Sequence, residues 1–255
     1  MSGKMVRTFD GKLLVQRLKY SLDSIGEPYT LGLSGGLDSS FLLYLSGEQC
    51  EPCVVGIDGA KDITNAEIVA RHYKRQLKVE IFSESDVIEA ASLVLRADPG
   101  ASILEISYDS VLAGLMQRSE RRFIVTGQGS DEIFYGYSKF IDGRESSNVE
   151  SLRILLERTA PREMNLASIM QKELVTPYLD RDIIDSFAGL PREMHISEGI
   201  GKSILRKSAL DAGFETKFVN SKKLAAQYGS GFKRVISSAI KSGIIGNTER
   251  INGGL

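Results

Sequence analysis

The stretch "LGLSGGLDSSFLLYL" at residues 31–45 runs from an apolar segment through Ser-Gly-Gly-x-Asp-Ser-Ser and back into an apolar segment. This order predicts a strand, a tight turn and a helix, because paired glycines mark turns and Asp38 or Ser39 is a good helix N-cap. Glycines also let backbone N–H groups approach a ligand, and the first turn of a helix offers unpaired donors at the positive end of its dipole. We therefore favour a nucleotide site here over a plain structural turn.

The residue types of this stretch suit a phosphate group. It is not a Walker A loop, since it lacks the lysine that would reach the β and γ phosphates. Asp38 offers a carboxylate suited to Mg²⁺. The backbone N–H groups and hydroxyls that would surround a phosphate-sized space belong to Ser34, Gly35, Gly36, Ser39 and Ser40.

Bulk composition indicates a globular protein that acts on a small molecule. The 255 residues are 42% hydrophobic and 25% charged, enough for one sizeable core, and the net charge is -1. A net charge this close to zero indicates no large basic surface, so a nucleic-acid or membrane partner is not expected. The start, "MSGKMVRTFDGK", has no apolar signal-peptide core, and no segment is long and apolar enough to span a bilayer. We expect a cytoplasmic protein, and a homo-oligomer is left open.

The two cysteines, Cys50 and Cys53, form one Cys-x-x-Cys pair. A redox or metal pair is one interpretation, but a zinc site would need further ligands, and only His72 and His195 are available as histidines. The interpretation that we favour is two small residues packed at a buried strand.

Alternating strand and helix patterns predict an α/β fold with a parallel sheet and helices on both faces. The expected strands are 29–33, 53–57, 78–82 and 121–127, and no strand is expected after residue 143. Helices are expected near 12–25, 63–77, 85–96, 107–118, 146–159, 162–173, 180–188, 201–212 and 231–241, with Thr64 and Glu67 as a capping box. We expect one domain, 1–255, with a nucleotide-binding part over about 1–143 and a helical lobe over about 144–255.

The loop after the fourth expected strand, "TGQGSDEIFYGYSKF" at 126–140, extends the site. Ligands of open parallel sheets bind at the carboxyl ends of the strands, which places this loop beside the first one. Gly127 and Gly129 flank Gln128, and Ser130 precedes Asp131 at the start of a helix. Ordinary helix capping would explain the acids but not the paired glycines. We expect Asp38 and Asp131 on the rim of the sheet rather than in its core, where they would together hold a magnesium-bound polyphosphate.

Both loops together, "SGGLDSS" (34–40) and "TGQGSDEIFYGY" (126–137), resemble the ATP-pyrophosphatase (PP-loop) family, within it the synthetase domain of asparagine synthetases and their β-lactam-forming relatives. Three later stretches are similar to family segments in the same order: "ELVTPYLDRDIID" (173–185), "GKSILRKSA" (201–209) and "SKKLAAQYGSGF" (221–232). The resemblance implies the adenine nucleotide alpha hydrolase-like fold and a reaction in which ATP and Mg²⁺ adenylate a carboxylate, pyrophosphate leaves, and an amine displaces AMP.

The resemblance also implies roles for individual residues. Lys223 matches the family's loop lysine and would stabilise the charge that develops at the α-phosphorus, because fixed cations stabilise such transition states. Lys222 is the alternative register, and the spacing to the following glycines favours Lys223. Lys202 and Arg206, four apart on an expected helix, are further candidates, with a solvated basic stripe as the alternative. Leu33 and Ile57, together with Val55, would wall the adenine.

Two departures from the family pattern affect the amine step and the choice of acid substrate. Gln128 stands where glutamine-dependent asparagine synthetases carry Glu and β-lactam synthetases carry Tyr, and an amide cannot accept a proton at working pH. Residues 174–176 replace the arginine that usually precedes the Pro of the fourth segment, so the acid substrate stays open.

The nitrogen source and the reaction class have alternatives. The chain opens with Met1-Ser2 rather than a nucleophilic Cys. We expect free ammonia, another amine or a separate glutaminase subunit to supply nitrogen for a small-molecule carboxylate. A tRNA-modifying PP-loop enzyme and a nucleotide-binding regulator without catalysis are the competing hypotheses.

Overall fold

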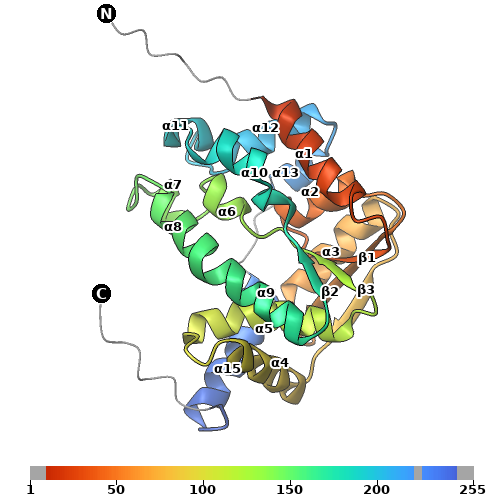
Figure 1. Ribbon diagram of the computed structural model, residues 1–255. Coiled ribbons are helices and arrows are strands. Elements are labelled where there is room, and N and C mark those ends of the chain that lie inside the picture. The colour runs from red at the N-terminus through yellow and green to blue at the C-terminus, as the bar shows by residue number, and fades with distance from the viewer. Residues whose placement is uncertain (1–9, 221–225, 246–255) are drawn as a thin grey trace, which may run out of the picture.

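One parallel sheet of five strands forms the centre of the computed structural model, which describes residues 10–220 and 226–245. The strand order is β3-β2-β1-β4-β5 (Figure 1). The bounds are β1 (Tyr29–Gly32), β2 (Cys50–Gly56), β3 (Lys78–Ile81), β4 (Phe123–Val125) and β5 (Glu173–Val175). The expected α/β class is confirmed.

The order of the strands creates a switch point between β1 and β4. Tyr29 of β1 pairs with Cys50 on one side and with Phe123 on the other. From β1 the chain builds outward through β2 and β3, and it then returns to the other side of β1 for β4 and β5. Ligands of such sheets bind where the order reverses, at the carboxyl ends of the strands. The loops that follow β1 and β4 are therefore neighbours at the expected place.

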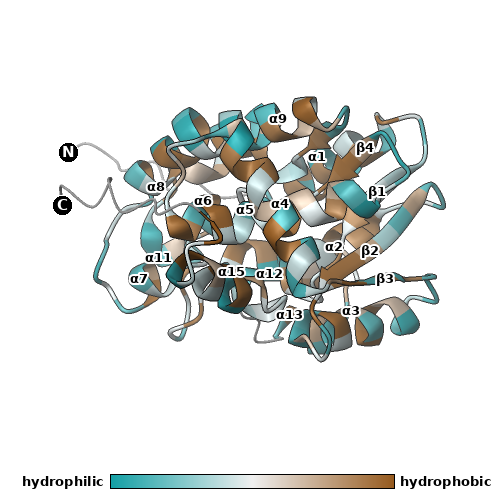
Figure 2. Ribbon diagram, turned by 90° about the horizontal axis from the view of Figure 1, so that it is seen from below, coloured by the Kyte–Doolittle hydropathy of each residue, from teal (hydrophilic) through white to brown (hydrophobic). Residues whose placement is uncertain are grey.

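The helices lie on both faces of the sheet and pack with the strands into two apolar clusters. In Figure 1, α1 and α12 lie on one side of the strands, and α4, α5 and α15 lie on the other. Figure 2 shows that β2 is mainly hydrophobic, whereas many helices carry both hydrophilic and hydrophobic residues. The first cluster takes buried residues from α1 (Gly11–Asp23), α2 (Leu37–Leu45), α3 (Lys61–His72), α12 (Ser203–Asp211) and α13 (Thr216–Val219). Buried residues of the second come from α4 (Glu84–Ala97), α5 (Ile103–Arg118), α9 (Ala160–Ile169) and α15 (Phe232–Lys241).

Short helices complete the described chain. They are α6 (Ser130–Ile133), α7 (Ser138–Ile141), α8 (Val149–Ile154), α10 (Arg181–Ile183), α11 (Arg192–His195) and α14 (Ala226–Gly229), with π turns at Leu155–Thr159 and Ile184–Ala188 and a 3-10 turn at Pro177–Leu179. Across residues 10–220 and 226–245, no helix is long and apolar enough to cross a membrane.

Three sequence predictions about the elements differ from the structure. A strand does occur after residue 143, because β5 adds to the sheet edge with Val175 paired to Val125. Three residues are too short for a periodic signal, and pairing with β4 makes them a strand. Thr64 and Glu67 form no capping box, since α3 begins at Lys61 with Ala60 as its N-cap. The helix expected from residue 107 begins at Ile103 instead, where Ser102 and Glu105 do form such a box.

Cys50 and Cys53 lie in different apolar clusters. Both thiols are buried and free. Cys50 belongs to the first cluster and Cys53 to the second, because residues three apart in a strand point to opposite faces. Burial raises the pKa of Cys50 and raises that of Cys53 to about 12. This placement supports packing and leaves no shared disulfide or metal site.

We predict that neither thiol reacts with a thiol-specific reagent in the folded protein at mildly alkaline pH. Only thiolates are nucleophilic, and burial disfavours the thiolate. In denaturant both thiols should react, which titration of released chromophore would record. Reaction of either thiol at its denatured rate without unfolding would contradict the buried placement.

Candidate functional site

The loop after β1 forms a tight turn into α2. Ser39 Oγ accepts a hydrogen bond from Ser34 N at 3.1 Å and lies 3.1 Å from Ser34 Oγ. Gly35 has φ +72°, and a Cβ there would be 2.5 Å from Cβ of Asn65 in α3, so only glycine fits. Gly36 is the N-cap of α2 and has no side chain to cap it. The first N–H groups of this nine-residue helix thus face the turn, as an anion site requires.

The loop after β4 closes onto the first one. A Cβ at Gly127 would lie 3.1 Å from Cβ of Asp38, which shows how closely the two loops approach. Gly129 has φ +90° and caps α6. From the first residue of that helix, Ser130 Oγ donates to Asp38 Oδ1 at 2.8 Å. The two predicted loops therefore form one site.

Lys202 bridges the two predicted aspartates. Its Nζ lies 2.7 and 2.8 Å from the oxygens of Asp38 and 2.7 Å from Oδ1 of Asp131. Burial alone would lower the pKa of Lys202, but the charges of Asp131 and Asp38 outweigh burial and raise it. One ammonium thus faces two carboxylates at the switch point.

The backbone around Lys202 is shaped for this contact. Lys202 has φ +62°, and its N donates to Phe134 O at 3.0 Å. A Cβ at Gly136 would overlap Asp131 Oδ1 and Lys202 Cε, and one at Gly201 would overlap the carbonyl of Tyr135. Two glycines therefore keep the space through which the lysine reaches the aspartates.

Burial differs between the two aspartates. Asp38 was expected on the rim, but it is only 5% exposed, and Tyr178 Oη donates to its backbone carbonyl at 3.1 Å. The side chain of Asp131 is 38% exposed. Replacing Asp38 therefore disturbs the interior as well as the site, which the rim placement did not anticipate.

The donor set fits Mg²⁺ only together with a nucleotide. Within the described ranges, no three His, Cys, Asp or Glu side chains gather as a metal cage. Mg²⁺ is commonly held by one or two carboxylates plus substrate phosphates. Asp38 and Asp131 supply two such carboxylates beside the turn at Gly35, so the residues present fit the ion.

Two of the four other residues predicted from the sequence, Arg206 and Ser40, lie within the described ranges. Arg206 does not point at the carboxylates: its Nε donates to Gly201 O at 2.9 Å and its Nη1 donates to Val219 O. Ser40 is fully buried. Lys222 and Lys223 lie outside the described residues, so their placement stays a prediction.

The three residues expected to wall the adenine do not share one face. Leu33 is buried in the first apolar cluster and Val55 in the second, so the sheet separates them. Ile57 packs against both clusters, and its N donates to Ser230 O at 3.0 Å. Leu33 and Val55 thus belong to different apolar clusters, and their contact with an adenine stays a prediction.

Gln128 contacts a buried acid that the sequence did not single out. Its Nε2 donates to Glu163 Oε1 at 2.8 Å, and Glu163 in α9 is 4% exposed. Glu132, next to Asp131, is also buried and accepts from Tyr137 Oη at 2.6 Å. Burial and then the charge of Asp131 raise the pKa of Glu132 to about 7. Arg162 and Glu163 are two adjacent charged residues at the start of an expected helix, and no local pattern in the sequence marked them as buried.

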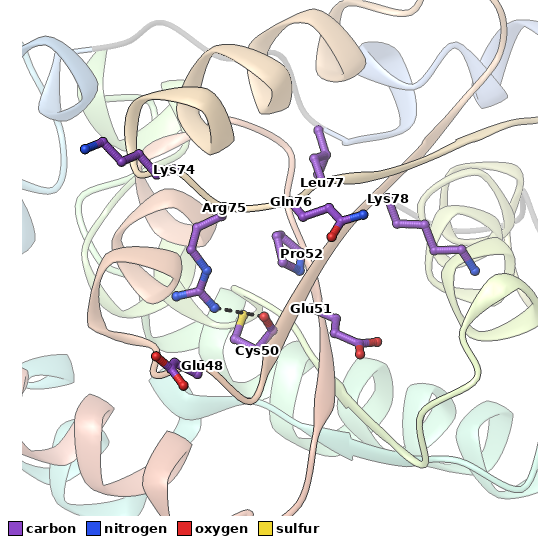
Figure 3. Close-up of a pocket in the computed structure, with 9 residues that line it drawn as sticks. All are labelled: Glu48, Cys50, Glu51, Pro52, Lys74, Arg75, Gln76, Leu77 and Lys78. Carbon is purple, nitrogen blue, oxygen red and sulfur yellow. Dashed lines mark hydrogen bonds between the residues drawn. The ribbon is translucent and has the colours of Figure 1, made fainter.

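A cavity of about 830 Å³ lies away from these residues, at the amino ends of strands β2 and β3 (Figure 3). It is lined by the start of β2, the start of β3 and the segment after α3. Arg75 there donates to the carbonyls of Ser46, Gly47 and Cys50, and Lys78 donates to that of Arg118. These two cations are engaged in holding backbone, so the cavity shows no built anion site.

Comparison with known proteins agrees with the site. The sequence matches the asparagine synthase family over residues 13–176 and 162–240. This chain belongs to the asparagine synthase family. The matched ranges contain every loop described above and the segment with Lys222 and Lys223.

Curated relatives are longer than this chain. A Methanocaldococcus jannaschii protein named "putative asparagine synthetase (glutamine-hydrolyzing) 1" is 25% identical over 86% of this chain and 48% of its own length. The asparagine synthetase (glutamine-hydrolyzing) of Asparagus officinalis is 27% identical over 71% of this chain and 35% of its own length. A probable enzyme of the same name from Dictyostelium discoideum is 24% identical over 74% and 39%. The chain thus spans about half the length of these relatives or less.

We predict that Lys202→Met lowers the free energy of unfolding by about 3–5 kcal/mol, because it removes the buried cation that contacts both Asp38 and Asp131. Urea unfolding would measure the loss. Arg153→Met is the matched control: this arginine pairs with Glu150 and Glu157 on the surface, and exposed pairs contribute about 0–1 kcal/mol. An equal loss in the two variants would refute the bridging role of Lys202.

Proposed function

We propose that this chain catalyses ATP-dependent amide formation, in which a carboxylate is adenylated with release of pyrophosphate and an amine then displaces AMP. The observation that carries the proposal is Lys202 held between Asp38 and Asp131 beside the glycine turn at Gly35. Membership of the asparagine synthase family supports the same reaction. ATP and Mg²⁺ are the cofactors that we propose.

The turn and the first helix would bind the polyphosphate. The N–H groups at the start of α2 offer donors and the positive end of the helix dipole. Asp38 and Asp131 would hold Mg²⁺, which supplies charge neutralisation at the phosphates when bound. Lys202 carries the one ammonium seen between these carboxylates in the described residues, and it keeps their negative charge compensated before ATP arrives.

We propose free ammonia, another amine or a glutaminase as the nitrogen source, and a small-molecule carboxylate as the other substrate. The relatives' names state glutamine hydrolysis for those longer proteins. A thiolation reaction has less support here, because Cys50 and Cys53 are buried with raised pKa values. Adenylation followed by amide formation uses the groups that do converge at the switch point.

A product assay tests this function. We expect purified protein with Mg²⁺, ATP, ammonium chloride and a panel of carboxylates that includes L-aspartate to release pyrophosphate and AMP with at least one acid. Asp131→Asn should remove most of this release, because the remaining carboxylate holds the ion poorly. Asp142→Asn, an exposed pair with Arg144, should leave it unchanged. ADP and orthophosphate as products would refute the proposal, and ATP binding without turnover over the whole panel would favour a regulator.

A second assay tests the loop lysine. We propose that Lys223 stabilises the charge that develops at the α-phosphorus, so Lys223→Ala should lower turnover by ~100-fold or more with ATP affinity nearly kept. Lys222→Ala is the matched control in the adjacent register and should change turnover by less than ~5-fold. Steady-state kinetics with calorimetry of ATP binding would separate the two effects. Equal weakening of binding and turnover in Lys223→Ala would instead mark a ground-state phosphate contact.

A further inference from the structure

The outer edge of the sheet at β3 carries accessible apolar side chains. β3 is the last strand in the order β3-β2-β1-β4-β5, so within residues 10–220 and 226–245 no strand pairs with its outer side. Figure 2 shows β3 at the margin of the sheet. Val79 there is 37% exposed and Ile81 is 49% exposed. Such an edge is a template for pairing with a strand of another chain.

The register with β2 decides which backbone groups of β3 face outward. Ile81 lies opposite Gly56 in the parallel pair, and Phe82 N donates to Gly56 O at 2.8 Å. N–H and C=O groups alternate in direction along a strand, so every second residue counted back from Phe82 turns these groups towards β2. The residues between them turn theirs outward, and these are Leu77, Val79 and Ile81.

The sequence of this edge, "LKVEI" at 77–81, is complementary to itself when a second copy runs in the opposite direction. In an antiparallel pair centred on Val79, each Val79 lies opposite the other. Leu77 then lies opposite Ile81 of the second copy, and Lys78 lies opposite Glu80. Cross-strand pairs of apolar residues and of opposite charges both stabilise such a ladder.

Hydrogen bonding and charge together select this register. Directly opposite residues of an antiparallel ladder exchange their N–H and C=O groups in alternate pairs. The outward groups of Val79 therefore need another outward-facing residue opposite them, which excludes a shift by one residue. A shift by two residues places Lys78 opposite Lys78 or Glu80 opposite Glu80, and like charges directly opposite are destabilising.

Lys78 and Glu80 are placed to meet a second copy. Both lie on one face of β3, with Lys78 Nζ 3.2 Å from Glu80 Oε1, and the side chain of Lys78 is 49% exposed. An isolated ion pair at the surface contributes little to stability, whereas several charges in a network contribute more. A second copy would join its own Lys78 and Glu80 to this pair.

We propose that two copies of this chain associate through antiparallel pairing of β3 with β3, which joins their sheets into one continuous sheet. The twofold axis passes beside Val79. This surface is separate from the candidate site, because β3 ends the sheet beyond β2, whereas the site follows β1 and β4. The inference therefore does not depend on the proposed function.

Paired charge variants test the register. Sedimentation equilibrium of the wild-type protein should show a monomer–dimer equilibrium. Lys78→Glu alone and Glu80→Lys alone should each weaken self-association by ~10-fold or more, because like charges then lie opposite each other. An equimolar mixture of the two variants should form a heterodimer with about wild-type affinity, since an acidic edge then faces a basic one.

A charge reversal elsewhere is the control for these variants. Glu150→Lys changes an exposed glutamate that pairs with Arg153 on α8, and it should leave the equilibrium unchanged. A wild-type protein that stays monomeric up to ~1 mM would overturn the proposal and leave the edge to a strand of another protein. Folded variants that do not associate when mixed would overturn it as well.

A proline variant tests the backbone contact. The N–H of Val79 faces outward, so Val79→Pro removes a donor that the ladder between copies needs and none that pairs with β2. We expect this variant to keep the wild-type circular dichroism spectrum and to be monomeric. Val79→Ala keeps the N–H and should associate within ~5-fold of the wild type. A folded Val79→Pro that still forms dimers would show that another surface holds the copies together.

Cross-linking decides the pairing even if the proline variant does not fold. Directly opposite residues that exchange hydrogen bonds have Cα atoms ~5.5 Å apart, within the range that a disulfide spans. Mild oxidation of Val79→Cys should therefore link the two copies, while Cys50 and Cys53 stay buried and free. Val149→Cys on α8, at a position that is 70% exposed, is the matched control and should link far less. An equal yield of linked dimer from both variants would overturn the pairing of β3 with β3.

Discussion

A buried ammonium between two carboxylates is the interaction on which the candidate site depends. Lys202 lies 164 residues from Asp38 in sequence, and its Nζ contacts both Asp38 and Asp131. With 7% exposure, the lysine would be costly to bury without these partners. The contact joins the first loop, the second loop and the start of α12 into one unit.

The parallel pairing of β1 with β4 is what makes this contact possible. Tyr29 pairs with Phe123, so the two chains leave the sheet side by side. Gly127 then allows the second loop to approach Asp38, and Gly136 leaves space for the lysine. Larger side chains at these positions would force the loops apart, and the carboxylates would lose their common cation.

Two different electrostatic environments lie next to each other at this edge of the sheet. Around Lys202, opposite charges are close together, which suits the binding of a charged polyphosphate with its counter-ion. Around Glu163, several acids face the single Arg162, and burial raises the pKa of Glu163 well above its ordinary value. Gln128 lies between them in the second loop, so one short segment contacts both environments.

The sequence by itself determined the α/β class and the two glycine loops, and it predicted that Asp38, Asp131 and Ser130 lie at one end of the sheet, whereas Lys202 was a candidate only through the resemblance to the family. Those features are local: glycine turns, helix-start acids and strand patterns are encoded within a few neighbouring residues. The tertiary structure alone decided that Lys202 points between the aspartates while Arg206 binds the carbonyls of Gly201 and Val219, and that Glu163 meets Gln128. Such contacts depend on the path of the backbone between distant segments, and no local pattern records that path. The three-residue strand β5 follows the same rule, because only its pairing with β4 makes it a strand.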